Sequence, residues 1–181
     1  MRAPGMDLDR EGGPAMADHD IVLTWLNDAY SVENALVHVL ERHAKAAKDF
    51  PHVQRKIAAH LAQTRRHAEL IADRVTALGS RPSAHKDRWA GLLAPVQNVL
   101  AGAVDEEDVL KNSISDYAAE NFEIATYQAL MTAAEDTEDT ATAQVCQQIL
   151  TDEREMAGWL DEHIPLLADH IVRQAAPTGD S

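Results

Sequence analysis

Apolar residues recur at steps of three and four along four long stretches of the chain, the spacing that gives a helix one apolar face. Alanine is abundant and aromatic residues make up only 4% of the chain, a composition that favours helices over strands. Pro165 is expected to end or kink the last helix, with a weaker helical tail as far as Gln174. The predicted helices cover residues 20–48, 51–78, 105–134 and 141–163.

The connections between the predicted helices differ in length. Phe50-Pro51 and the polar run 135–140 make short turns, so the helices on either side of each turn are expected to lie antiparallel. Residues 83–103 make a long linker, in which a short helix is predicted from about Trp89 to Leu100. Two antiparallel hairpins joined by a long crossover are the ferritin-like form of the all-α four-helix bundle. A simple up-and-down bundle is the alternative, which the long linker disfavours.

One domain is expected over residues 18–175, with a flexible leader at 1–17 and a flexible tail at 176–181. The leader lacks the apolar core of a secretory signal, and no apolar stretch approaches the roughly 20 residues that span a bilayer. The net charge of −14 argues against binding to nucleic acid and suits a protein that attracts cations. The single cysteine, Cys146, excludes an internal disulfide, so the reducing cytoplasm is the expected location.

Each predicted helix carries an ionisable residue on its apolar face, where an apolar residue is expected. Glu33 and His67 lie equally far from the first turn. Glu120 and Glu153 lie equally far from the second turn. Both distances are about 17 residues, or roughly 25 Å of helix, and residues equidistant from a hairpin turn share one height. The four side chains are therefore expected at one level inside the bundle, with Glu123 beside Glu120.

Carboxylates gathered in an apolar interior need compensation, because burying each charge costs several kcal/mol. A divalent cation supplies it, and mixed carboxylate and imidazole ligands suit iron or manganese better than zinc. The alternative for any single glutamate is a helix rotated to turn it toward solvent, which four residues at one height disfavour. His60 is expected to be a hydrogen-bonded core residue or an additional ligand. Tyr30, Tyr117 and Tyr127 are expected to pack beside the ligands, and His38, His43, His52 and His85 to lie on the surface.

Four stretches of the sequence resemble the YciE/YciF family of ferritin-like, stress-associated bacterial proteins. Glu33 lies in DAYSVENAL, and His67 lies in HLAQTRRHAEL. Glu120 and Glu123 lie in AENFEIATYQAL, and Glu153 lies in LTDEREMAGWL. With the spacing between them, these stretches cover residues 18–165. The resemblance implies a ferritin-like four-helix bundle that forms dimers and holds a dinuclear centre of the iron type.

The sequence departs from the pattern of that family on three helices. Gln63 stands where glutamate is typical and His67 where glutamine is common, so His67, with Gln63 as a further candidate, would supply the ligands of that helix. Asn121-Phe122 replaces a frequent His-Tyr pair. Met156 stands where the wider di-iron group carries histidine. The metal content implied is therefore two ions, one ion or none.

Two main hypotheses for the function follow, and whether the protein is an enzyme stays open. In the first, a homodimer in the cytoplasm binds iron or manganese, serves a stress response, and oxidises ferrous iron or reduces peroxide, with O2 or peroxide as the partner. Glu120 would then bridge, Glu33 and Glu153 would be terminal or bridging ligands, His67 would supply a neutral nitrogen and Glu123 an extra carboxylate. In the second, a metal-free helical dimer with a degenerate site acts as a structural or interaction protein. A subunit of an iron-storage cage is a third, weaker hypothesis.

Overall fold

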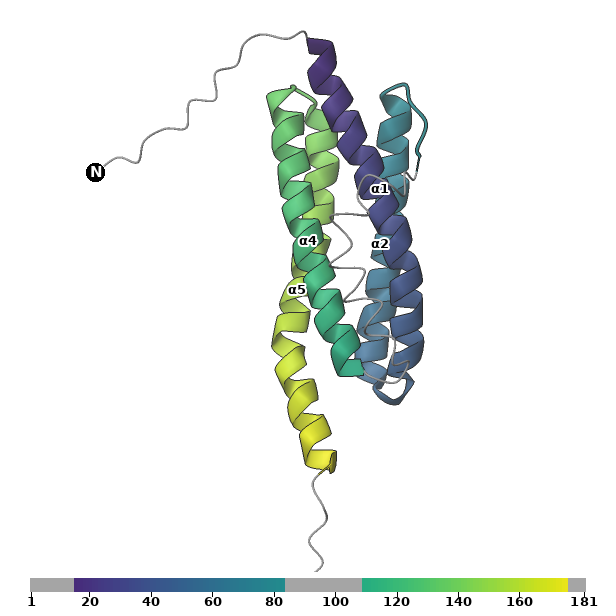
Figure 1. Ribbon diagram of the computed structural model, residues 1–181, viewed down its shortest axis with the longest axis vertical. Helices are drawn as coiled ribbons and strands as arrows, with labels where there is room; N and C mark the ends of the chain where they lie inside the picture. The colour runs from purple at the N-terminus through teal and green to yellow at the C-terminus, as the bar shows by residue number, and fades with distance from the viewer. Residues whose placement is uncertain (1–14, 84–108, 176–181) are drawn as a thin grey trace, which may run out of the picture.

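The computed structural model describes residues 15–83 and 109–175 of the chain. Within these residues the structure consists of four long α-helices and one short 3-10 helix, with no strand. The predicted all-α four-helix bundle is therefore confirmed (Figure 1). The elements are α1 (Ala15–Ala46), η1 (Ala47–Asp49), α2 (Pro51–Ala77), α4 (Val109–Asp136) and α5 (Thr140–Ala175).

The helices pack as two antiparallel hairpins laid side by side (Figure 1). Helix α1 pairs with α2 through η1, and α4 pairs with α5. Across the bundle, α1 contacts α4 and α2 contacts α5, and the helices of each of these pairs also run antiparallel. As a result α2 and α4 run in the same direction, which is the arrangement that a crossover between two hairpins requires.

The residues at each turn explain why the chain turns there. Phe50 has φ −121° and ψ 73°, outside the helical region, and Pro51 then begins α2, where its missing N–H costs no helical hydrogen bond. At the other turn, Asp139 caps α5 by accepting hydrogen bonds from the backbone N–H (3.0 Å) and the hydroxyl (2.6 Å) of Thr142. Arg74 of α2 donates to the same carboxylate at 2.8 Å, which ties this turn to the neighbouring hairpin.

The two larger apolar cores lie at different heights in the bundle, and the ionisable residues of the apolar faces fall between them along every helix. One core includes Leu26, Ile71, Leu130 and Ile149. The other includes Leu40, Ile57, Val109, Met156 and Leu160. Glu33, for example, follows Leu26 and precedes Leu40 on α1. The candidate site is thus a polar layer enclosed between two apolar layers.

Helix α5 does not end at Pro165, which excludes one of the two predicted effects of this proline, and the predicted helical tail is confirmed. The N–H that proline lacks would have bonded to the carbonyl of Asp161, an exposed residue whose carbonyl water can reach. Beyond the proline, Leu167 is buried and Ile171 packs against the second core. These contacts keep the helix continuous to Ala175.

Other predicted boundaries fall partly outside the described residues. Helix α1 begins at Ala15, before the predicted start at residue 20. The predicted short helix from Trp89 to Leu100, the start of the third predicted helix at 105–108 and the tail at 176–181 lie outside the described residues, as does most of the leader. Among the described helices, none combines the length and apolarity needed to cross a membrane.

Candidate metal centre

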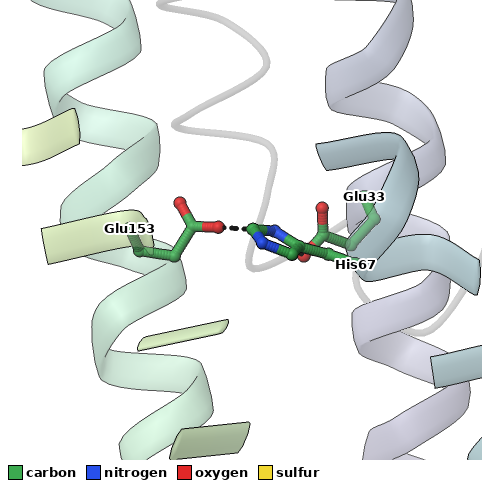
Figure 2. A group of neighbouring side chains, drawn as sticks. All are labelled: Glu33, His67 and Glu153. Atoms are coloured by element: carbon green, nitrogen blue, oxygen red, sulfur yellow. Dashed lines mark ion pairs between the residues drawn. The ribbon is translucent and has the colours of Figure 1, made fainter. Parts of the chain in front are cut away.

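Three side chains from three helices meet in the polar layer. His67 of α2 lies between Glu33 of α1 and Glu153 of α5, and all three are fully buried (Figure 2). His67 Nδ1 lies 2.9 Å from Glu153 Oε1 and 3.6 Å from Glu33 Oε1. One ligand atom from each residue lies within 4.8 Å of the others, so one cation could touch all three.

A second group of three shares Glu153 with the first. His60 Nε2 lies 3.1 Å from Glu120 Oε1 of α4 and 3.7 Å from Glu153 Oε2. These three ligand atoms also lie within 4.8 Å of one another, and the three residues are buried. Glu153 therefore turns one oxygen toward each imidazole. Glu153 is thus the residue that the two groups share.

Glu123 and Tyr127, one turn apart on α4, line the Glu33 side of the site. The hydroxyl of Tyr127 donates a short hydrogen bond to Glu33 Oε1. The carboxyl groups of Glu123 and Glu33 are also hydrogen-bonded to each other, and Glu123 Oε1 is buried without a partner. Glu123 thus lies next to the first group of ligands without belonging to either group of three.

Each imidazole is held from behind by a second polar group. His67 Nε2 lies 3.0 Å from Asp152 Oδ2, so its N–H donates to that carboxylate while Nδ1 faces the site. His60 Nδ1 lies 3.3 Å from Gln63 Oε1, which leaves Nε2 facing the site. Metal-binding histidines are typically oriented in this way, through the ring nitrogen that does not hold the metal.

The unsatisfied atoms of the site fit a cation. Buried polar atoms normally have hydrogen-bond partners, and atoms without one need an explanation. His67 Nδ1 and Glu153 Oε1 form an ion pair at 2.9 Å, and neither atom has a further hydrogen-bond partner among the described residues. The other atoms of the two groups without a partner are Glu33 Oε2, His60 Nε2, Glu120 Oε2 and Glu153 Oε2. Oxygen and nitrogen atoms that converge unpaired in a buried layer are what a hard or borderline divalent ion requires.

The central ion pair of the site is set by competing effects. Burial acts to lower the pKa of His67, but the carboxylates of Glu153 and Glu33 outweigh it and raise this pKa to about 9. Burial acts to raise the pKa of Glu153, but the contacts with His67 and Glu120 outweigh it and lower that pKa. In the metal-free protein near neutral pH, His67 is therefore positive and Glu153 negative.

The remaining ligand candidates favour their neutral forms. Burial, helped by the charge of Glu153, raises the pKa of Glu33 to about 8. Burial also raises the pKa values of Glu120 and Glu123 well above the ordinary carboxyl range, and it lowers the pKa of His60. Protons thus take the place of a cation in the metal-free site. A cation that binds there must displace them.

The structure brings together all five predicted ligands, Glu33, His67, Glu120, Glu123 and Glu153, and adds His60 to the second group. Tyr127 lies beside a ligand as predicted. Tyr30 and Tyr117 instead are half-buried side chains that pack against the two apolar cores. Met156, where the resemblance places a histidine in the wider group, fills the second core. Asp152 was not predicted, and its position immediately before Glu153 is the one signal in the sequence that points to it.

His43 was expected on the surface, and that prediction was wrong. The residue is buried, and its Nδ1 lies 2.7 Å from Oδ1 of Asp116, one turn before Glu120 on α4. The second oxygen of Asp116 is buried without a partner, as is Asn112 Oδ1. The polar layer therefore continues from the two ligand groups toward the end of the bundle at η1.

The fold and this buried layer of carboxylates and imidazoles define a ferritin-like four-helix bundle. A family model described as "Domain of unknown function (DUF892)" matches residues 17–176. The chain belongs to that family. The predicted resemblance to the YciE/YciF proteins is confirmed by this match and by the structural neighbours.

Three solved structures illustrate the similarity. A protein from Xanthomonas campestris pv. campestris is 26% identical, with a TM-score of 0.73 over 87% of this chain and 97% of that one. The Escherichia coli stress protein YciF is 23% identical, with a TM-score of 0.68 over 81% of this chain and 94% of that one. A bacterioferritin from Desulfovibrio desulfuricans, described as having a diiron site, is 22% identical, with a TM-score of 0.68 over 94% of this chain and 95% of that one.

Proposed function

We propose that this chain binds one or two iron or manganese ions in the buried cluster centred on Glu153. The observation that carries the proposal is the position of Glu153, a fully buried carboxylate whose two oxygens face two different imidazoles and which belongs to both groups of converging ligand atoms. A carboxylate so placed can bridge two ions or hold one ion in either group. Removing this single side chain should therefore affect both groups at once.

The side chains of the cluster would each have a distinct task. His67 and His60 would bind through Nδ1 and Nε2 respectively, with Asp152 and Gln63 holding the opposite nitrogens. Glu33 would bind through its carboxylate, which the hydrogen bond from Tyr127 holds in place. Glu123 and Glu120 would give up protons as the cation enters and could take them back during turnover. When bound, a pair of ferrous ions would supply the two electrons that reduce one peroxide, with two protons, to two molecules of water.

The physiological setting that we propose is a stress response, with oxidation of ferrous iron by O2 or peroxide as the reaction. Support comes from the similarity to a protein described as a stress protein and to a bacterioferritin described as having a diiron site. The buried cluster supports the same reaction, because the two apolar cores shield it from water on both sides. We also infer a homodimer in the cytoplasm, supported by the resemblance and by the single, buried cysteine.

A metal-free scaffold is the second candidate function, and two specific observations favour it. Gln63, in place of a carboxylate, is bonded to His60. Met156, in place of an imidazole, is fully buried in an apolar core. In this case the protons and the His67–Glu153 ion pair would stabilise the layer permanently, and the protein would act through its surface.

Metal loading separates the two candidates. Protein freed of metal with a chelator is incubated anaerobically with excess ferrous or manganous ions, desalted and analysed for metal per chain. We expect one or two ions per chain, with a loss of bound metal in Glu33→Ala and in Glu120→Ala. Addition of O2 or peroxide to the ferrous form should then consume the oxidant faster than the same amount of free ferrous ion does.

The matched control is Glu162→Ala, which removes an exposed carboxylate from α5 and should leave the metal content unchanged. A wild-type protein that retains no more ferrous or manganous ion than the two ligand variants contradicts the proposal and favours the scaffold. A protein that retains metal but does not accelerate consumption of either oxidant supports the metal centre and contradicts the proposed reaction.

A further inference from the structure

A second pair of histidines meets at the surface between α2 and α5. His52, near the start of α2, and His163 of α5 bring their Nε2 atoms within 3.3 Å of each other. One turn further along α2, Lys56 Nζ lies 2.7 Å from Glu155 Oε1 of α5. Helices α2 and α5 run antiparallel and pack against each other (Figure 1), and both contacts lie along the line where they meet, so the histidine pair is a product of helix packing.

The ring of His163 is fixed in one orientation. Its Nδ1 lies 2.8 Å from the carbonyl oxygen of Trp159, to which the Nδ1–H donates. The ring also stacks on the Trp159 indole, with centroids 4.0 Å apart and an interplanar angle of 16°. With the proton on Nδ1, the lone pair is on Nε2, the atom that faces His52. A backbone carbonyl behind one ring nitrogen is a common support for a histidine that binds metal through the other.

The separation of the two Nε2 atoms matches a shared cation. Bonds of about 2.0–2.1 Å and a tetrahedral angle place two imidazole nitrogens about 3.3–3.4 Å apart. The observed distance is 3.3 Å. A direct N–H···N contact would use only one lone pair, whereas a cation between the rings accepts both.

We propose that His52 and His163 form a surface site for Zn²⁺ or Cu²⁺, separate from the buried cluster. Imidazole ligands suit these late first-row ions, and Cu²⁺ binds most tightly among the divalent ones. His52 is exposed and His163 is half-buried, so water can complete the coordination. His52 precedes His60 by eight residues on α2, about 12 Å of helix rise. The site depends on no residue of the buried cluster.

Quenching of tryptophan fluorescence by Cu²⁺ tests the site, because Trp159 is stacked on one of the two ligands. Chelator-treated full-length protein is titrated with Cu²⁺ at pH 8. We expect saturable quenching with one ion per chain, reversal by a chelator, and recovery of fluorescence only when a large excess of Zn²⁺ displaces the more tightly bound Cu²⁺. In Trp159→Phe the quenching should be largely lost, while calorimetry still detects binding of Cu²⁺.

His52→Ala is the decisive variant, since His52 is exposed and its removal leaves the stacked His163–Trp159 pair intact. We expect the Cu²⁺ concentration for half-maximal quenching to rise by at least about tenfold, the loss typical of even a supporting residue in a metal site. His38→Ala is the matched control, because His38 is also exposed, and should titrate like wild type.

A double variant, Glu33→Ala with Glu120→Ala, separates this proposal from the buried centre. Quenching that persists in the double variant and is lost in His52→Ala confirms an independent surface site, whether or not the buried cluster binds iron. Two results would overturn the proposal. In one, His52→Ala is half-quenched at the same Cu²⁺ concentration as wild type. In the other, quenching is lost only in the double variant.

Discussion

His67 Nε2 lies 3.0 Å from Oδ2 of Asp152, a carboxylate on the flank of α5 that is 30% exposed. The contact fixes which nitrogen of His67 faces inward, because the N–H that donates to Asp152 leaves Nδ1 for the interior. It also connects the buried layer to the surface. A carboxylate behind a histidine makes the imidazole a better metal ligand.

Replacing Asp152 should therefore lower the affinity for metal without removing a ligand. We expect Asp152→Ala to lower the affinity for ferrous or manganous ions by about 10–100-fold, the range typical for such supporting carboxylates. Asp152→Asn, which keeps a hydrogen-bond acceptor, should have a smaller effect. Competition with a chelator of known affinity measures both, and Asp161→Ala, an exposed aspartate of the same helix, is the control. Wild-type affinity in Asp152→Ala would contradict this role.

Replacing Glu120 with leucine should have opposite effects in the two forms of the protein. In the metal-free form, an apolar side chain removes a buried, protonated carboxyl without a full set of partners, so Glu120→Leu should melt at the same temperature or higher. In the presence of metal, the wild type should gain about 5–10 °C at 100-fold excess over Kd, and the variant should gain less.

Calorimetric or fluorescence-based melting with and without ferrous or manganous ions measures these opposite effects on the melting temperature. Met156→Leu, a substitution in the adjacent apolar core, is the control and should leave the metal-dependent gain intact. Equal gains in wild type and Glu120→Leu would show that the metal binds elsewhere.

Binding of a cation to the cluster should release protons. At pH 7 burial keeps Glu33 largely protonated, since its pKa is raised to about 8, and His67 largely charged, since its pKa is raised to about 9. Both groups must lose their protons to bind metal, so the affinity should rise as the pH increases from 6 toward 9. Titration calorimetry in buffers of different ionisation enthalpy measures the protons released. An affinity independent of pH over this range would argue against these two ligands.

The turn between α4 and α5 offers a test of stability away from the metal. Asp139 caps α5 and binds Arg74, so Asp139→Ala should lower the free energy of unfolding by about 1–2 kcal/mol. Burial acts to raise the pKa of Asp139, but the hydrogen bonds from Thr142 and Arg74 outweigh it and lower that pKa below 3.8. The contribution of Asp139 is therefore present above its unfolded pKa and is lost as the pH falls through the folded one.

Denaturant unfolding of wild type and Asp139→Ala at pH 7 and at pH 3 measures the contribution of Asp139 to the free energy of unfolding. The difference between the two proteins should shrink at the lower pH. Glu138→Ala is not a suitable control, because Glu138 has a positive φ of 58°. Asp161→Ala serves instead, and should change stability little at either pH. A difference that grows as the pH falls would be contrary to the prediction.

The fold was predictable from the sequence because the residues that end and begin its helices act locally. Phe50-Pro51 marks the first turn with a proline, which is favoured at the first position of a helix. Pro165 does not end α5, and the reason is physical. Whether a proline ends a helix depends on what its neighbours pack against, and the contacts of Leu167 and Ile171 are tertiary.

The ligand candidates were predictable where helical spacing and turn symmetry agree, as for Glu33 and Glu153. Spacing shows which helix face a residue occupies, but not which atoms converge. For this reason the sequence could not show that Glu153 joins both groups or that His60 belongs to one of them. Asp152 lies on the flank of the apolar face of α5, whereas His43 continues the buried spacing of Leu36 and Leu40 on α1. Their roles follow only from the packing of α5 against α2 and of α4 against α1.

Anomalous X-ray diffraction from crystals soaked anaerobically in ferrous ions is the most direct test of the central claim, that Glu153 holds metal between two imidazoles. Data collected on both sides of the iron absorption edge locate the ions without reference to the side chains. We predict a peak bonded to Glu153 and His67, with any second peak bonded to Glu153 and His60. Peaks confined to surface residues, with the interior between Glu33, Glu120 and Glu153 empty at full soaking concentration, would contradict the account.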